Sequence, residues 1–176
     1  MEHTMNGKKI KKRITTANII NTIYTVLLCF MEISAGVGIK ACHDSMAKLM
    51  DGVQNADAES YMGGYQVVGG LFGAGAVTVA LGILYLVAIV SAFYLVLFLI
   101  ENIIGYRIAS RLKREEHSMA LVKKVKRNAV FKCVLALMVI IPSGYVMYSM
   151  ESFAMLIVII PQAVVMALAI NSMRLL

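Results

Sequence analysis

The run from Val67 to Ile100 constrains this chain more than any other feature, because it contains no charged residue and no proline. As an α-helix with a rise of about 1.5 Å per residue it would be about 50 Å long, whereas the hydrocarbon core of a bilayer is about 30 Å thick. The run is therefore either one membrane crossing that is too long or two crossings that are too short. The choice between them fixes the topology of the protein.

Hydrophobic residues make up 60% of the 176-residue chain and charged residues only 15%, with a mean hydropathy of +0.78. These values are typical of an integral membrane protein. Three further apolar runs each have roughly the 20 residues that a membrane-spanning helix needs. They cover residues 18–39, 129–149 and 153–173. Each of these runs is predicted to cross the membrane once.

Positive charges decide how often the long run crosses. One cluster, Lys8 to Arg13, precedes the span at 18–39, and a second lies in the polar segment 101–128. Clusters of Lys and Arg beside membrane spans usually stay in the cytoplasm. A single crossing by residues 67–100 leaves both clusters on one side, whereas two crossings would place the second cluster outside. The long run is therefore predicted to be one helix.

The sequence predicts an all-α integral membrane protein, a four-transmembrane-helix bundle with both termini cytoplasmic. It forms a single domain over 1–176, with an outer loop at 40–66 and a basic cytoplasmic loop at 101–128. We expect it in the cell membrane (inner or plasma) as a multi-pass protein. Basic residues at this position favour anionic lipid headgroups over nucleic acid as a partner. The headgroup ligands predicted are Arg107, Arg111, Lys123, Lys124, Lys126 and Arg127.

The first span carries a stripe of small and polar residues. They recur every three or four positions, so they share one face of a helix. Its members are Asn18, Thr22, Thr25, Cys29, Glu32 and Gly36. An ionised acid within the bilayer costs a few kcal/mol on insertion scales, so Glu32 needs a partner or a function. It is predicted to be either an ion or proton ligand in a pathway, or a hydrogen-bonding group that joins helices.

Two prolines lie inside the third and fourth spans. Pro142 and Pro161 each remove a backbone donor, which predicts a kink at each position. Both fall at about the depth of Glu32 if the spans alternate in direction. The sequence therefore predicts a polar layer that serves as a pathway or gate, with ordinary kinks in a static bundle as the alternative. This layer would contain Glu32, Thr78, Ser143 and Gln162.

The outer half of the long run has small residues at helical spacing. Such residues allow a second helix to approach closely, so they predict a packing ridge within the chain or between two copies of it. A glycine-allowed break in the helix is the remaining alternative. The ridge is predicted from Gly69, Gly70, Gly73, Ala74 and Gly82.

The sequence contains no motif that points to an enzyme, and neither a metal nor a cofactor is expected. Cys42, His43 and Asp44 are adjacent and would point in different directions, so they predict no metal site. An intramembrane lipid-handling enzyme is kept as an exception. The function predicted first is an oligomeric transport or pore-forming subunit, with Asn18, Thr22 and Thr25 of the stripe and the Glu32 layer lining its pathway. The alternative is a non-conducting assembly, regulatory or immunity-type subunit that binds another membrane protein.

Overall fold

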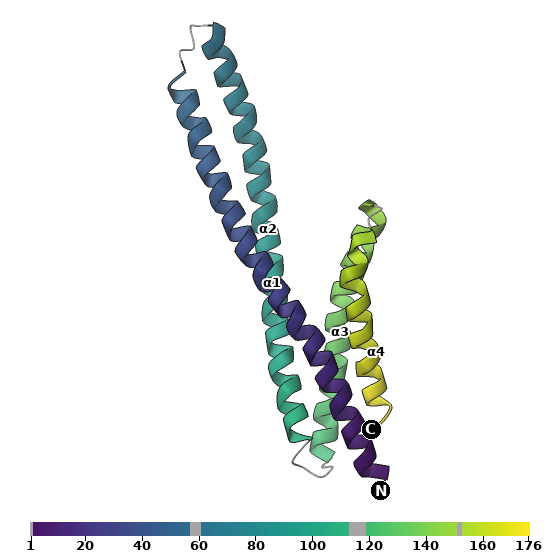
Figure 1. The fold of residues 1–176 in the computed structure, drawn as a ribbon. Coiled ribbons are helices and arrows are strands. Elements are labelled where there is room, and N and C mark those ends of the chain that lie inside the picture. Colours follow the sequence, from purple (N-terminus) through teal and green to yellow (C-terminus); the bar gives the residue numbers. More distant parts are fainter. Residues whose placement is uncertain (1, 57–60, 113–118, 151–152) are drawn as a thin grey trace. The chain divides into compact units, whose positions relative to one another are not determined.

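The computed structural model describes residues 2–56, 61–112, 119–150 and 153–176, and each element in these ranges is a helix (Figure 1). Four of the helices are long and apolar enough to cross a membrane, as the sequence predicts. A single 3-10 turn, η1 (Phe153–Met155), precedes the last of them. The four are α1 (Glu2–Gln54), α2 (Tyr61–Arg111), α3 (Met119–Met150) and α4 (Leu156–Met173).

The helices extend well beyond the predicted spans. The sequence predicts a loop over 40–66, but α1 continues to Gln54 and α2 begins at Tyr61. In the same way the predicted loop 101–128 is helical up to Arg111 and again from Met119. Charged residues end the apolar runs without ending a helix, because Lys and most other charged residues have good helix propensity. The segment from Cys42 to Gln54 is thus part of α1.

The long run Val67–Ile100 lies within α2, which is one helix of 51 residues without interruption. The glycines of its first half do not break it. The helix ends at Arg111, a basic residue in the last turn, where a positive charge is favourable for the helix dipole. A single helix agrees with the single crossing predicted for this run.

The chain forms two compact units, and each is described by itself. The hairpin unit, Leu27–Tyr94, contains the second part of α1 and the first part of α2. The four-helix unit contains Met1–Val26 and Leu95–Leu176. In the hairpin unit the two helices approach closely at glycines: a Cβ on Gly73 would lie 3.2 Å from the Leu49 side chain, and one on Gly38 would lie 3.3 Å from Leu84.

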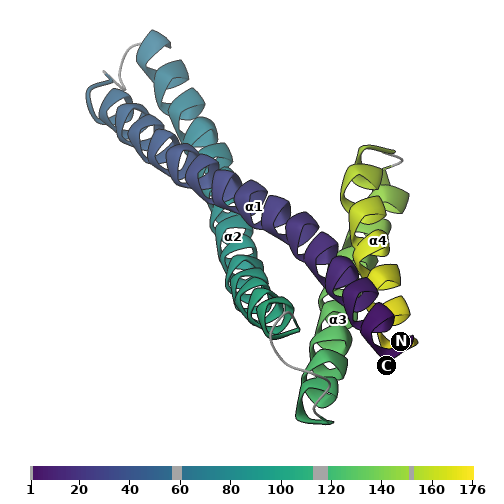
Figure 2. The same ribbon diagram turned by 60° about the horizontal axis from the view of Figure 1, so that its bottom comes forward.

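In the four-helix unit α3 and α4 lie side by side as an antiparallel pair (Figures 1 and 2). The start of α1 is tied to α4, since Arg13 donates a hydrogen bond of 2.6 Å to the Asn171 carbonyl. An apolar cluster joins the ends of α1, α2 and α3 and stabilises this end of the unit by removing apolar surface from water. Its buried members are Ile10, Ile14, Ile108, Ala109 and Val125.

Candidate functional site

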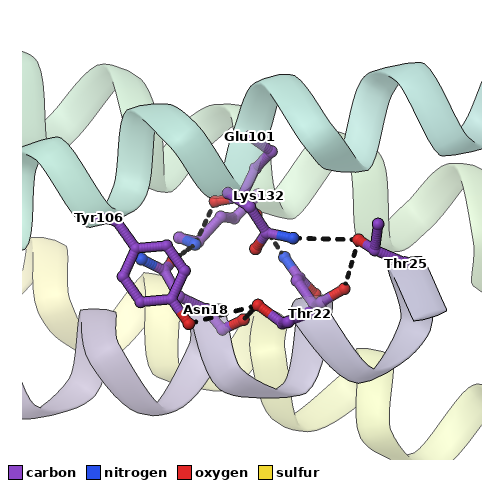
Figure 3. Close-up of polar contacts among 8 residues, drawn as sticks. Asn18, Thr22, Thr25, Glu101, Tyr106 and Lys132 are labelled. Atoms are coloured by element: carbon purple, nitrogen blue, oxygen red, sulfur yellow. Dashed lines mark hydrogen bonds and ion pairs between the residues drawn. The ribbon is translucent and has the colours of Figure 1, made fainter.

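The core of the four-helix unit contains a buried ion pair. The Lys132 ammonium on α3 contacts the Glu101 carboxylate on α2, and their side chains are 2% and 0% exposed (Figure 3). Charges inside a membrane protein are costly unless they are paired and hydrogen-bonded, so such groups are usually functional. We call this pair and the four buried polar residues around it the polar core. They are Asn18, Asn21, Thr25, Glu101, Asn102 and Lys132.

Two asparagines of α1 complete the contacts of the ion pair. Lys132 Nζ also donates to Asn18 Oδ1, and Asn21 Nδ2 donates a hydrogen bond of 2.6 Å to Glu101 Oε2. An ammonium only donates and an ionised carboxylate only accepts, so the orientations of both amides are determined by chemistry. Each charge therefore has a neutral hydrogen-bond partner besides its counter-ion. Helix α1 supplies both of these partners, Asn18 from the stripe and Asn21 from beside it.

A second pair of polar side chains links α1 to α2 one turn further on. Asn102 Nδ2 donates to Thr25 Oγ1 at 3.0 Å, and Thr25 in turn donates to the Asn21 carbonyl at 2.9 Å. Thr22 donates to the Asn18 carbonyl at 2.8 Å, and its oxygen lies 3.3 Å from the Tyr106 hydroxyl (Figure 3). Because the single Thr22 proton is used, Tyr106 is the donor in that contact.

Three amide atoms of the polar core have no hydrogen-bond partner among the described residues: Asn18 Nδ2, Asn21 Oδ1 and Asn102 Oδ1. Buried polar atoms of this kind are rare in native proteins and call for an explanation. Two of the three are oxygens, one of them on the Asn21 amide that donates to the Glu101 carboxylate. Oxygen atoms of this type, together with a carboxylate, are the ligands that hard cations prefer.

The approach of α2 to α1 depends on Gly105. A Cβ at this position would lie 2.6 Å from Asn18 Nδ2 and 2.8 Å from Asn18 Cγ, distances that real Cβ atoms do not show. Asn18 is fully buried and is held by Lys132, so it has little room to move. Only glycine allows the α2 backbone to lie this close to the amide.

Comparisons with protein-family models, curated proteins and solved structures found no match to this chain. Its function is therefore inferred from the site itself.

The structure divides the predicted stripe between the two units. Asn18 and Thr25 lie in the polar core, and Thr22 bonds to Tyr106 beside it. Glu32 lies in the hairpin unit, half-buried, and accepts a hydrogen bond of 2.6 Å from Ser91. The side chains of Asn18, Thr22 and Thr25 thus contact polar side chains of α2 or α3.

Thr78, predicted to share a layer with Glu32, lies away from it within the hairpin unit. Its hydroxyl donates to the Ala74 carbonyl of its own helix at 2.8 Å. Ser91, the partner of Glu32, follows Thr78 by more than three helical turns, which is about 20 Å along the α2 axis. The structure therefore does not bring Thr78 and Glu32 together.

The other predicted layer residues lie in the four-helix unit. Gln162 is 1% exposed, and both polar atoms of its side chain lack a hydrogen-bond partner among the described residues, so it does not bond Ser143. Ser143 is half-buried on α3. Pro142 and Pro161 lie inside α3 and α4, and both helices continue through them.

The predicted packing ridge contains glycines with different surroundings. A Cβ on Gly70 would overlap the Val53 side chain, and one on Gly73 would press on Leu49. Cβ atoms on Gly69 and Gly82 would meet nothing within 4 Å. Gly70 and Gly73 therefore allow α1 and α2 to approach each other, whereas Gly69 and Gly82 have open space around them.

Some of the predicted headgroup ligands surround a cavity of about 540 Å³ between α2 and α3. Its basic lining residues come from both helices, and Asn128 lies among them. The lining does not include Lys123 or Lys126, which are exposed on α3. The four basic lining residues are Arg107, Arg111, Lys124 and Arg127.

Sequence reasoning missed the ion pair. Lys132 is the one charged residue within the apolar run 129–149, and Glu101 directly follows the run 67–100. An ionisable residue inside a predicted span is by itself a reason to look for a partner on another helix. Lys132 carries that signal, but the length of the apolar run predicts the span without it.

Proposed function

We propose that this protein is a membrane transport subunit in which a proton or a small cation exchanges with the Lys132 ammonium at the Glu101 carboxylate. The observation that carries the proposal is the buried ion pair with unpartnered amide oxygens beside it. If the ion pair only held the helices together, no unpartnered oxygens would be needed beside it. Well-packed apolar residues would then stabilise the bundle as well or better.

The exchange follows from the chemistry of the pair. A proton that binds to Glu101 neutralises the carboxylate and removes the charge that holds Lys132 in place. A small cation would have the same effect, with Asn21 Oδ1 and Asn102 Oδ1 as additional ligands. Lys132 also lines a second cavity of about 10 Å³ beside Asn128 and Ser172, which gives the displaced ammonium polar neighbours.

The experiment that tests this function is a flux measurement on liposomes that contain the purified protein. We expect the wild-type protein to dissipate an imposed proton, Na⁺ or K⁺ gradient faster than empty liposomes do. The double variant Lys132→Met/Glu101→Gln has no charge in the core and is expected to fold but to lose this flux. Asp44→Asn, which removes an exposed carboxylate of the hairpin unit, serves as the control and should leave the flux unchanged.

Absence of flux for all three ions would overturn the transport proposal.

One observation favours the alternative, a non-conducting subunit that binds another membrane protein. In the outer part of α2 the apolar side chains of Phe72 and Val79 are 78% and 65% exposed, and the apolar run of α2 exceeds the bilayer thickness by about 20 Å. Part of that face would then need a protein partner or a second copy. If a partner covers this face, Phe72→Asp would abolish the co-purification of that partner with this protein.

Both termini are proposed to be cytoplasmic, on the basis of the basic residues at the start of α1 and at the junction of α2 and α3. Single cysteines in a cysteine-free chain test this orientation. A membrane-impermeant maleimide should label Lys48→Cys in intact cells and should label Ser110→Cys only after the membrane is permeabilised. Both positions are exposed in the structure. Labelling of Ser110→Cys in intact cells would contradict the proposed topology.

A further inference from the structure

We infer that the cavity between α2 and α3 is a binding site for an anionic phospholipid, with the lipid phosphate held by the basic side chains and Asn128. This inference is independent of the transport proposal. The cavity has a volume of about 540 Å³, within the range of about 300–1,000 Å³ that ligand sites occupy. It lies entirely within the four-helix unit.

The charge of the lining identifies an anion. Arg107 and Arg111 are one turn apart on α2, and Lys124 and Arg127 are one turn apart on α3, so each helix turns one basic face to the cavity. Among the residues that the structure describes, no acidic side chain lines it. Arginine forms paired hydrogen bonds with phosphate oxygens, which makes a phosphate group the best-fitting anion.

Asn128 is the second and independent indication of a ligand. Its side chain is 3% exposed, and neither amide atom has a hydrogen-bond partner among the described residues. The Nδ2 group can donate to a phosphate oxygen, and Oδ1 requires a donor. A headgroup with hydroxyl groups, such as that of phosphatidylglycerol, supplies both, whereas phosphatidylcholine offers no donor and adds a positive charge to an already basic site.

The apolar part of the cavity distinguishes a lipid from free phosphate. Ile100 and Ile104 on α2 are 44% and 39% exposed, and with Phe131 they form an apolar wall beside the basic residues. Ile100 is the last residue of the apolar run of α2, so the cavity lies where a membrane span meets its polar flank. An acyl chain can lie along this wall while the phosphate lies among the basic groups.

Native mass spectrometry of the full chain in detergent tests the site, with phosphatidylglycerol and phosphatidylcholine of identical acyl chains as probes. We expect phosphatidylglycerol to bind about tenfold more tightly than phosphatidylcholine, and Arg111→Gln/Arg127→Gln to reduce its affinity about tenfold. Lys123→Gln/Lys126→Gln removes the same charge from the same region outside the cavity and should change the affinity less than about twofold.

Asn128→Leu should reduce the affinity for phosphatidylglycerol and leave the weak binding of phosphatidylcholine unchanged. The melting temperature of each variant in detergent shows whether it is folded. Arg111→Gln/Arg127→Gln is expected to melt at the wild-type temperature, because both arginines are exposed. Equal losses in the two double variants would overturn the site in favour of diffuse electrostatic attraction. Displacement of phosphatidylglycerol by an equal concentration of inorganic phosphate would show that the cavity binds phosphate without a lipid.

Discussion

Lys132→Met is expected to lower the free energy of unfolding by about 3–5 kcal/mol, the cost of removing one partner from a buried ion pair. The substitution leaves the Glu101 carboxylate 0% exposed, with only the Asn21 amide as its hydrogen-bond donor among the described residues. Methionine has nearly the length of lysine, so the loss arises from the unpaired charge and not from a large cavity. Unfolding in mixed micelles, followed by circular dichroism, measures the effect.

The double variant separates the charge from the packing. Glu101→Gln removes the remaining charge and still offers Asn21 an acceptor, so Lys132→Met/Glu101→Gln should be more stable than Lys132→Met alone. Lys126→Met is the matched control, because it removes an exposed positive charge from the same helix, and its effect should stay within about 0.5 kcal/mol. A loss in Lys132→Met no greater than in Lys126→Met would show that the buried ion pair does not form.

Gly105→Ala is expected to cost about 1–3 kcal/mol, the range for overpacking in a well-packed core. The added Cβ would lie 2.6 Å from Asn18 Nδ2, so α2 must move away from α1 or Asn18 must release Lys132. The same unfolding measurement gives its size. In an exposed helix position the change from glycine to alanine would instead stabilise the helix by about 1 kcal/mol.

Gly82→Ala supplies that comparison, because a Cβ at Gly82 meets nothing within 4 Å. It should leave the stability unchanged or raise it. The cost of Gly105→Ala should also shrink when Asn18 is replaced by Ala, since the overlapping amide is then absent. Equal effects of Gly105→Ala and Gly82→Ala would mean that the helices do not approach closely at Asn18.

The helical class and the helices themselves were predictable from local pattern. The backbone N–H and C=O groups of a long uncharged run find no water inside a bilayer. A single run pairs all of these groups within itself when it forms a helix. The side chains of Asn18, Thr22 and Thr25 were also predicted to share one face, since helical periodicity is a local property. The ends of α1 and α2 were predicted poorly, because polar residues such as Lys40 end an apolar run without ending a helix.

The partners of that polar face were decided by the tertiary structure. Asn21 and Glu101 are separated by 80 residues in the sequence, and Asn18 and Lys132 by 114. Periodicity assigns a residue to a face of its own helix but does not give the height at which two helices align. That alignment depends on packing, here on the close approach at Gly105, where the absence of a side chain brings Asn18 to the level of Glu101 and Lys132. The sequence by itself determined four apolar helices with a polar stripe, and only the packing of those helices turned the stripe into a buried ion-pair site.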